Sequence, residues 1–461
     1  SLGGFDEDFA PAYYEESDFC VRLRKAGKRI VYEPRAVITH FEFASTGGMN
    51  KASELQQEHR KLFCEKHEEF LTQFFDNQQQ SPLRARSPAG VETVLMIDDR
   101  VPYPSMGSGY PRSCHIIQEL VARPMRVTFY PLQFPHDDWL DIYTEIGVDV
   151  EVMLDHGRER LQQFLEERAG FFDYILISRD HNMEFFNTAA ILEPAIAEKA
   201  QVIYDAEALI APREISQRRL RGEDVSETEL NLAVKDEIQK ARLADAVIAV
   251  SEAEAESFRR IGDKKTVVAG HAITARRGDK GFEARRDMLF VGALREDESP
   301  NVDSLLWFIE NSLPAIIAAE PDVRLIIVGD NTAAALTSIN QDSVVFMGRQ
   351  ASIKDFYDSC RVFIAPTRFA AGIPHKVHEA AANGIPSVVT PLLAGQLNWR
   401  DETELLVAKS GDEFAKQCLR LYQDERLWQA VQDGGSAAVA RDCSEQGFRD
   451  SLYDLLDKQA S

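Results

Sequence analysis

Three features are scarce in this sequence: long apolar runs, paired cysteines and positive charge. No run approaches the roughly 18 apolar residues that span a membrane, and the opening stretch SLGGFDEDFA lacks the charged and apolar regions of a signal peptide. We therefore expect a cytoplasmic location. The six cysteines are scattered without CxxC or zinc-finger spacing, which predicts reduced structural thiols and no metal site.

Acidic residues outnumber basic ones. The chain has 75 Asp and Glu against 52 Lys and Arg, for a formal charge of −23. This balance argues against a nucleic-acid partner, because phosphate binding needs a basic surface, although it leaves room for a local basic pocket. With 461 residues, 44% of them hydrophobic and 28% charged, the sequence is typical of a globular protein with two or three domains.

The strand and helix pattern divides the chain. Residues 76–90 are polar, contain two prolines and predict a linker after an N-terminal segment, 1–75. From Val91 onward, strands alternate with helices, which is typical of a parallel sheet covered on both faces. The alternation begins again after Arg285. We therefore expect an α/β fold with two tandem Rossmann-like domains, 91–275 and 276–461, and a ligand cleft at the carboxyl ends of their strands.

Individual elements follow from periodicity. The amphipathic stretch 443–458 is expected to pack back on the first of these domains. Predicted strands are 29–32, 93–97, 127–130, 173–177, 201–204, 246–250, 266–268, 288–291, 324–328, 343–346, 362–365, 387–389 and 405–407; predicted helices are 15–26, 51–75, 111–122, 158–169, 187–199, 226–243, 252–261, 301–318, 352–359, 374–382 and 411–423.

One short helix is the strongest candidate for a binding site. Pro374 is suited to its first position, and Asn383-Gly384 supplies the turn that ends it. Lys376 then lies in the first turn, where unpaired N–H groups already create positive potential, so its position makes sense if an anion binds there. Glu379 follows on the same face, within reach of a sugar hydroxyl. The alternative is an exposed Lys376/Glu379 pair that contributes only about 0.3 kcal/mol to the helix.

Residues 1–75 carry a partial family pattern. GGFDEDF at 3–9, the acidic group Glu15-Glu16-Ser17-Asp18 and His40 resemble the C-terminal end of the catalytic domain of family 2 glycosyltransferases. The resemblance implies that Glu16 takes the position of the catalytic base and that a metal-binding motif lies in a missing upstream region of the same polypeptide. The alternative is that the acidic residues form only a solvated helix N-terminus.

A second resemblance covers roughly residues 91–435. FVGALREDESPNVDSLLWFIENSLPAI, RLIIVGDN, VVFMGR and the stretch 361–391, together with YDAEALIAPRE and ADAVIAVSEAEAESF, resemble the group 1 (family 4) glycosyltransferases of the GT-B fold. The resemblance implies a nucleotide-sugar donor, linked to UDP, GDP or ADP, and a retaining mechanism without a metal.

The resemblance assigns roles to several residues. It implies that Glu379 contacts the ribose and that Lys376 neutralises diphosphate charge as the glycosidic bond breaks. Three glycine positions, Gly107, Gly109 and Gly292, match the loops that face the donor; without the resemblance, the first two read as a plain turn. His181 matches a histidine that the family often has near the reacting sugar. The alternative is that His181 is an ordinary loop histidine. The expected donor site is completed by Arg295, Arg368 and Gly372. On the acceptor side the candidates are Asp205 and Arg213; the alternative is that these two residues form an ion pair of the fold.

Two departures from the family pattern bear on activity. The first glutamate of the E-x7-E motif falls at Ala371, and the common GR…KG pair falls on Ala293 and near Pro300-Asn301. This leaves Lys376 to carry the diphosphate with Arg295 or Arg368 as helpers.

The leading hypothesis is a hexosyltransferase-type glycosyltransferase that uses a glycan or lipid-linked acceptor in bacterial polysaccharide biosynthesis, in the cytoplasm or at the inner face of the membrane. The alternatives are a nucleotide-sugar epimerase of the same fold and a non-catalytic module that binds glycans or partners, for which Ala371 is the hint.

Overall fold

The computed structural model describes residues 2–31, 33, 35–39, 49–74, 83, 88–107, 109–262, 264–337 and 339–457. The chain divides into two compact units, Ser1–Glu92 and Thr93–Ser461, which are described separately.

The first unit is a small helical assembly of η1 (Glu7–Phe9), α1 (Glu15–Lys25), α2 (Met49–Lys66) and α3 (Glu68–Leu71). Asp18 is buried and accepts hydrogen bonds from Arg22, at 2.7 Å, and from His67, at 2.8 Å. Glu16 is exposed on α1. The predicted strand 29–32 is wrong for its described part, 29–31, which has no regular structure. His40 and most of the predicted linker 76–90 lie outside the described residues.

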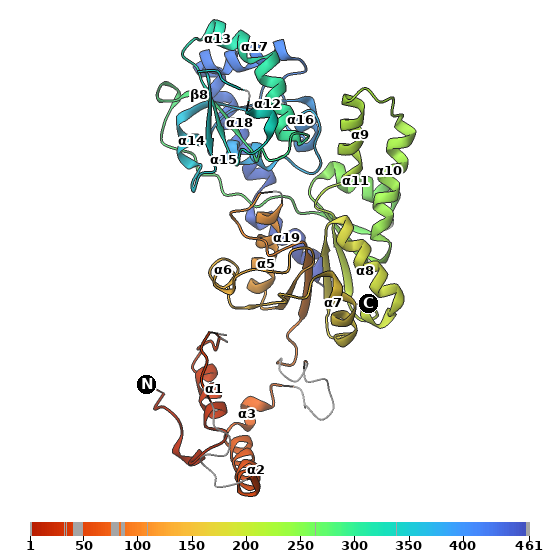
Figure 1. The fold of residues 1–461 in the computed structure, drawn as a ribbon, viewed down its shortest axis with the longest axis vertical. Helices are drawn as coiled ribbons and strands as arrows, with labels where there is room; N and C mark the ends of the chain where they lie inside the picture. The colour runs from red at the N-terminus through yellow and green to blue at the C-terminus, as the bar shows by residue number, and fades with distance from the viewer. Residues whose placement is uncertain are drawn as a thin grey trace. The chain divides into compact units, whose positions relative to one another are not determined.

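The second unit contains two parallel sheets, each with helices on both faces (Figure 1). The first sheet has the strand order β3-β2-β1-β4-β5-β6-β7 and the second has the order β10-β9-β8-β11-β12-β13. All strand pairs are parallel. Both orders run outward in two directions from the first strand of the sheet, which is the arrangement of doubly wound Rossmann-like folds. The expected pair of Rossmann-like sheets is therefore confirmed.

Continuous apolar runs form the strands because both faces of each sheet are covered. The first sheet consists of β1 (Thr93–Asp98), β2 (Arg126–Pro131), β3 (Val150–Val152), β4 (Tyr174–Ser178), β5 (Gln201–Asp205), β6 (Ala246–Ala249) and β7 (Lys265–Val268). Its helices are α5 (Tyr110–Ala122), α6 (Trp139–Glu145), α7 (Gly157–Glu167), α8 (Asp180–Leu192), α9 (Ala211–Leu220), α10 (Glu227–Gln239) and α11 (Glu252–Ile261), with η2 (Pro194–Ile196) and η3 (Lys240–Leu243).

The second sheet has apolar clusters on its two faces. It consists of β8 (Arg286–Val291), β9 (Leu325–Val328), β10 (Val344–Gly348), β11 (Cys360–Ala365), β12 (Ser387–Val389) and β13 (Leu406–Val407). Its helices are α12 (Pro300–Asn311), α13 (Leu313–Ala319), α14 (Lys354–Ser359), α15 (His375–Ala382), α16 (Pro391–Leu397), α17 (Gly411–Gln423) and α18 (Glu425–Asp442), with η4 (Phe282–Ala284) and η5 (Ala334–Leu336).

Some predicted elements were displaced or missed. The helix predicted at 187–199 is α8, which starts at Asp180 directly after β4, and the helix predicted at 301–318 is interrupted at Ser312. Short elements such as β3, α6 and α16 were not predicted, because they carry too few residues for a periodic signal.

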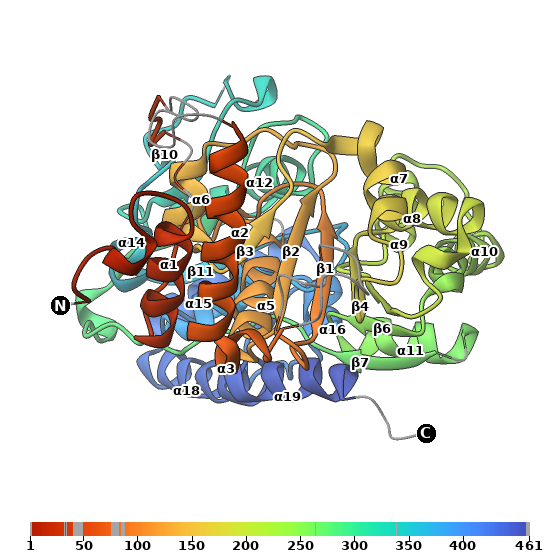
Figure 2. The ribbon, with the colours of Figure 1, turned by 90° about the horizontal axis from the view of Figure 1, so that it is seen from below.

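The chain returns from the second sheet to the first at its end. Figure 2 shows α18 and α19 (Glu445–Leu456) following one another along the same edge of the unit. Phe448, Leu452, Leu455 and Leu456 join the core of the first sheet, and Arg449 pairs with Glu119 at 2.6 Å. The expected packing of the C-terminal stretch on the first domain is confirmed.

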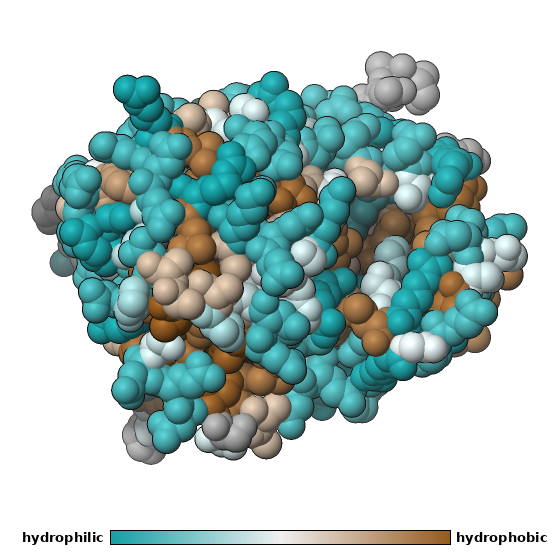
Figure 3. All heavy atoms as spheres, turned by 90° about the horizontal axis from the view of Figure 1, so that it is seen from above, coloured by the Kyte–Doolittle hydropathy of each residue, from teal (hydrophilic) through white to brown (hydrophobic). Residues whose placement is uncertain are grey.

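The surface seen from above is mostly hydrophilic, with apolar side chains gathered in a hollow on the side where α9 and α10 lie in Figure 1 (Figure 3). Across the described ranges, no single helix has the length and apolar character needed to cross a membrane; only the bent pair α12 and α13 meets that test jointly.

Candidate functional site

The two sheets place their candidate residues at equivalent positions. In a doubly wound sheet, ligands bind where the strand order reverses, at the carboxyl ends of the two central strands. In the second sheet these strands are β8 and β11, which are followed by the loops 292–299 and 366–374. In the first sheet they are β1 and β4, followed by the loop 99–109 and the start of α8.

Helix α15 begins one residue later than predicted. It spans His375–Ala382, and Pro374 precedes it as the cap residue without a side-chain hydrogen bond to the helix. Gly384 ends the turn after the helix with φ of +73°, as its sequence position predicted. Lys376 lies in the first turn of α15, where the N–H groups of His375 and Val377 already donate to the carbonyls of Ile373 and Pro374, each at 2.9 Å.

Lys376 is a partly buried cation held by a neutral group. Its Nζ lies 2.9 Å from Oδ1 of Asn301, at the start of α12, and 5.0 Å from the centre of the Phe290 ring. No carboxylate of the described residues lies within 4.0 Å of it. Burial lowers the pKa of the Lys376 ammonium to about 8. A cation in such surroundings gains from a bound anion, which would restore the interactions lost on leaving water.

Glu379 is partly buried on the same helix. Its Oε2 lies 3.5 Å from the hydroxyl of Tyr357 and 3.5 Å from Nδ1 of His375. Both contacts are at the long end of hydrogen bonding, so the carboxylate keeps most of its accepting capacity for a ligand hydroxyl.

The two arginines proposed as helpers are already paired. Arg295 lies 2.8 Å from Asp330 in an exposed ion pair, and Arg368 binds Asp303 through both oxygens, with its Nε at 2.9 Å. Recruitment of either arginine to a diphosphate requires its carboxylate partner to be displaced. The loop after β8 is also tight, since a side chain at Gly292 would meet the amide of Asn301.

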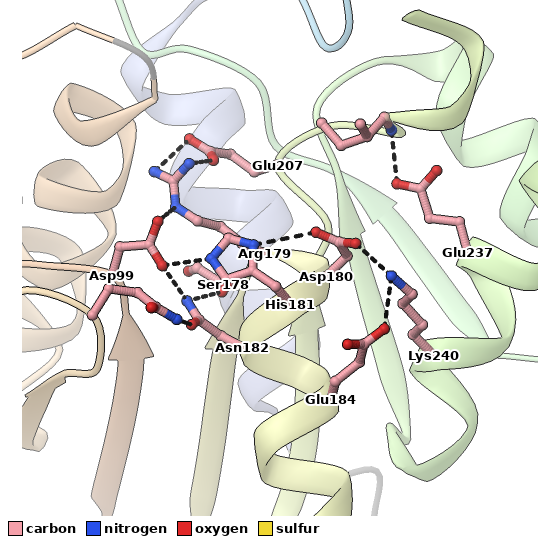
Figure 4. Close-up of polar contacts among 12 residues, drawn as sticks. Asp99, Ser178, Arg179, Asp180, His181, Asn182, Glu184, Glu207, Glu237 and Lys240 are labelled. Atoms are coloured by element: carbon pink, nitrogen blue, oxygen red, sulfur yellow. Dashed lines mark hydrogen bonds and ion pairs between the residues drawn. The ribbon is translucent and has the colours of Figure 1, made fainter. Parts of the chain in front are cut away.

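The first sheet presents a charged network at its switch point (Figure 4). Arg179 follows β4 with φ of +75°, a backbone conformation that is uncommon for a residue with a side chain. Its Nε lies 2.8 Å from buried Asp98, and its guanidinium also pairs with Glu207. The ring of Tyr110 lies beneath the guanidinium at 4.7 Å. The network therefore holds one partly buried arginine between three acidic side chains, of which Asp99 is the third, at 3.5 Å.

His181 occupies the first turn of α8 beside this network. Its Nε2 lies 2.6 Å from Asp99, which also accepts a 2.9 Å hydrogen bond from Asn182, and its Nδ1 lies 3.4 Å from Asp180. Hydrogen bonds to Asp180 and Asp99 raise the pKa of His181 to about 9. The imidazole is therefore charged at neutral pH and is held by carboxylates on two sides, with 43% of its side chain exposed.

Gly109 and Gly107 differ in their surroundings. Gly109 has φ of +84°, and a methyl group on it would overlap the carboxylate of Glu207. A methyl group on Gly107 would meet no atom within 4 Å. Glu207 covers Gly109, and burial raises the pKa of its carboxyl group. Of the two predicted donor-facing glycines, only Gly107 thus presents open backbone.

The loop before α15 touches the first sheet. The backbone at Gly372 packs against Ala208 and the carbonyl of Glu207, where a methyl group would lie 3.3 Å from both. The carboxylate of Glu254, which accepts a 3.1 Å hydrogen bond from the N–H of Leu209, lies near the N–H of Gly372, and burial raises the pKa of that carboxyl group to about 7. The ring centres of His271 and His375 lie 4.3 Å apart across the same boundary. The loop that carries Gly372 therefore connects the Lys376 side of the cleft with the Arg179 network.

The two acceptor-side candidates do not pair with each other. Asp205 forms a fully buried ion pair with Arg112 at 2.8 Å and also accepts a 3.0 Å hydrogen bond from Ser178. It therefore serves the fold. Arg213 lies partly buried in α9, where its Nε has no hydrogen-bond partner.

Sequence reasoning missed four residues that the fold brings to these sites: Asn301, Arg179, Glu207 and Glu254. Asn301 was noted only as a departure from the family pattern; the other three come from loops and helices whose contacts leave no periodic signal. Within the described ranges, no group of three or more His, Cys, Asp or Glu is arranged to hold a metal ion.

Comparison with known proteins agrees with this geometry. Residues 285–424 match the family model described as Glycosyl transferases group 1. No curated protein sequence matches the chain.

Solved structures share the fold at low sequence identity. HepE from Anabaena, in complex with UDP and glucose, is 17% identical with a TM-score of 0.57 and covers 79% of this chain and 99% of its own. Sucrose-phosphate synthase from Thermosynechococcus elongatus is 14% identical with a TM-score of 0.57, covering 79% and 98%. The α,α-trehalose 6-phosphate synthase from Burkholderia multivorans is 12% identical with a TM-score of 0.53, covering 79% and 96%. These structures show the shared fold, and the family model over residues 285–424 is the match that supports a glycosyltransferase.

Proposed function

We propose that the protein is a nucleotide-sugar-dependent glycosyltransferase of the group 1 type, whose donor site lies at the switch point of the second sheet. The observation that carries this proposal is Lys376: a partly buried cation at the start of α15 that, within the described part of the chain, has an amide oxygen as its one polar partner. The family match over residues 285–424 and the UDP in the HepE complex support a nucleotide-sugar donor.

In the proposed mechanism Lys376, at the start of α15, holds the diphosphate of the donor. As the bond between sugar and phosphate breaks, negative charge grows on the leaving diphosphate, and Lys376 stabilises it. Glu379, three residues later, accepts hydrogen bonds from the ribose hydroxyls. Catalysis then rests on leaving-group stabilisation and positioning, with retention at the anomeric carbon.

The acceptor side of the proposal involves the first sheet. His181 is charged and exposed enough to contact a sugar, and its pairing with Asp99 fixes its ring. Both N–H groups of the protonated imidazole face carboxylates, at 2.6 Å from Asp99 and 3.4 Å from Asp180, so a sugar hydroxyl that accepts from His181 replaces the longer contact to Asp180; the charged ring does not act as a base. A glycan or lipid-linked acceptor in polysaccharide biosynthesis fits this arrangement.

Titration calorimetry with UDP, GDP and ADP tests the donor site. We expect at least one nucleotide to bind, and expect binding to be lost in Lys376→Ala while far-UV circular dichroism is unchanged. Absence of binding by all three nucleotides, with the fold intact, would contradict the proposal. Product analysis of nucleotide-sugar turnover without any acceptor separates a transferase from an epimerase.

A further inference from the structure

A cavity of about 850 Å³ lies between the two sheets, beside the loop that carries Gly372. The ends of β6 and β7 form one wall, and α15, α16 and the junction of α18 and α19 form the other. None of the residues assigned to the donor site, and neither Arg179 nor His181, lines it. Its size is within the range of small-molecule sites.

His378 of α15 faces this cavity with two unused ring nitrogens. Its side chain is only 1% exposed, and neither Nδ1 nor Nε2 has a hydrogen-bond partner. Burial lowers the pKa of His378 to about 3, so the ring is neutral and offers one N–H donor and one acceptor nitrogen. Gln396 of α16 adds a second polar atom, a buried Oε1 without a partner. Buried polar atoms are rarely left unsatisfied, so these atoms point to a ligand.

The charges around the cavity exclude an anion. Its two arginines, Arg400 and Arg441, are both held by buried Glu404, at 3.0 and 2.9 Å. Further carboxylates, Glu252, Glu256 and Asp442, line the same walls. Since Glu252 and Asp442 are themselves paired with arginines, no strong site for a cation remains among these residues either.

A neutral ligand with several hydroxyl groups fits this wall. A hydroxyl both donates and accepts, so one hydroxyl satisfies either nitrogen of His378 and another can donate to Gln396. Phe448 provides an aromatic surface for the C–H groups of such a ligand. We propose that this cavity is a second binding site, which takes a neutral saccharide through His378 and Gln396 and is distinct from the nucleotide site.

The walls come from both sheets, so the bound saccharide contacts both halves of the second unit. It is either the distal part of an acceptor glycan or a free sugar that acts as an effector. The two sources share the same recognition chemistry, and they differ in whether the saccharide is extended by the enzyme.

The test uses the full chain and four neutral disaccharides: maltose, cellobiose, lactose and sucrose. We expect at least one disaccharide to raise the melting temperature of the protein. Inorganic phosphate serves as an anionic probe, and we expect it to leave the melting temperature unchanged. Gly395 lines the cavity and has open space around it, so Gly395→Phe should fill the cavity and abolish the shift. Gly281, which also has open space but does not line the cavity, provides the matched control Gly281→Phe, which should keep the shift.

His378→Phe gives an independent readout. It removes two unpartnered nitrogens at nearly constant shape, so the unliganded variant should melt at a higher temperature than wild type while losing the disaccharide shift. The proposal is overturned if no disaccharide shifts the wild-type melting temperature, or if Gly395→Phe and His378→Phe keep the shift. UDP titration of Gly395→Phe reports the donor site separately, and we expect it to match wild type.

Mass spectrometry after incubation with a nucleotide sugar identifies the source. Extension of the bound disaccharide shows an acceptor, and recovery of the unchanged disaccharide shows an effector. Either result keeps the second site.

Discussion

Asn301 joins Lys376 to the loop after β8. Its Oδ1 lies 2.9 Å from Nζ of Lys376, and its Nδ2 donates to the carbonyl of Ala293 at 3.1 Å. The amide therefore positions the lysine without neutralising it, so that the positive charge remains available to a ligand.

Replacing Lys376 with Met is expected to abolish nucleotide binding and to stabilise the unliganded protein. The substitution removes a charge whose pKa is lowered by burial, and one pKa unit corresponds to about 1.4 kcal/mol, so we expect a gain of about 1 kcal/mol at pH 7 after allowance for partial exposure. Because the unfolded chain holds this proton more tightly, wild type should gain stability relative to the variant as pH rises from about 8 to 10.5. Denaturant unfolding at several pH values measures both effects.

Exposed Lys416 on α17 supplies the control. Lys416→Met should leave nucleotide affinity unchanged and alter stability by less than about 0.5 kcal/mol. Undiminished UDP binding by Lys376→Met would remove this lysine from the site.

Glu379→Gln is expected to weaken nucleotide binding about tenfold or more, as follows from the loss of a hydrogen bond to a charged group. The glutamine keeps its shape and can still accept from Tyr357. Calorimetry with UDP and with 2′- and 3′-deoxy UDP distinguishes the cause. If Glu379 binds the ribose, at least one deoxy nucleotide should bind wild type and variant with nearly the same affinity; an equal loss for all three nucleotides argues for a structural role.

His181→Gln is expected to change how stability depends on pH. The folded-state pKa of about 9 lies above the ordinary value of 6.5, so the ion pairs of His181 stabilise the protein fully below pH 6.5. This contribution is lost as pH rises through 9. The difference in unfolding free energy between wild type and variant should therefore shrink between pH 6.5 and 9. A difference that stays constant over this range shows that His181 does not titrate there.

Gly109→Ala is expected to destabilise the protein by about 1–3 kcal/mol, because the new methyl group overlaps Glu207 and the backbone has φ of +84°. Gly107→Ala, two residues earlier in open space, is the matched control and should change stability by less than about 0.5 kcal/mol. Glu207→Ala on its own removes an ion pair with Arg179, so it serves as the reference: in that background Gly109→Ala should cost less than in wild type, since the overlap is gone but the backbone strain remains. Equal stability of the two alanine variants would contradict the close packing of Glu207 on Gly109.

The sequence predicted every strand of the two sheets except β3, and helix α15 to within one residue, because strands buried on both faces read as continuous apolar runs and α15 has a clear start and end. The partners of the site residues depend on contacts between distant segments. The pairing of Arg368 with Asp303 joins residues 65 positions apart, and that of Arg179 with Glu207 joins two loops from different strands. Side-chain type at one position carries no information about such partners. The roles of Lys376, Glu379 and His181, the domain boundaries, and the family 2 resemblance of residues 1–75 stay predictions.

The two places where the chain passes between the sheets lie side by side. Ile273, on the first crossing, donates to the carbonyl of Cys443, on the second, at 2.8 Å, and Thr274 binds Glu445 at 2.8 Å. We therefore expect these two adjacent, hydrogen-bonded crossings to form a hinge, about which one sheet would rotate against the other. The rotation would move the opposite rim furthest, where Arg221 and Gln217 of the first sheet's side hold Glu298. Opening of the cleft to admit a donor would then break these rim contacts first and leave the Ile273–Cys443 link intact.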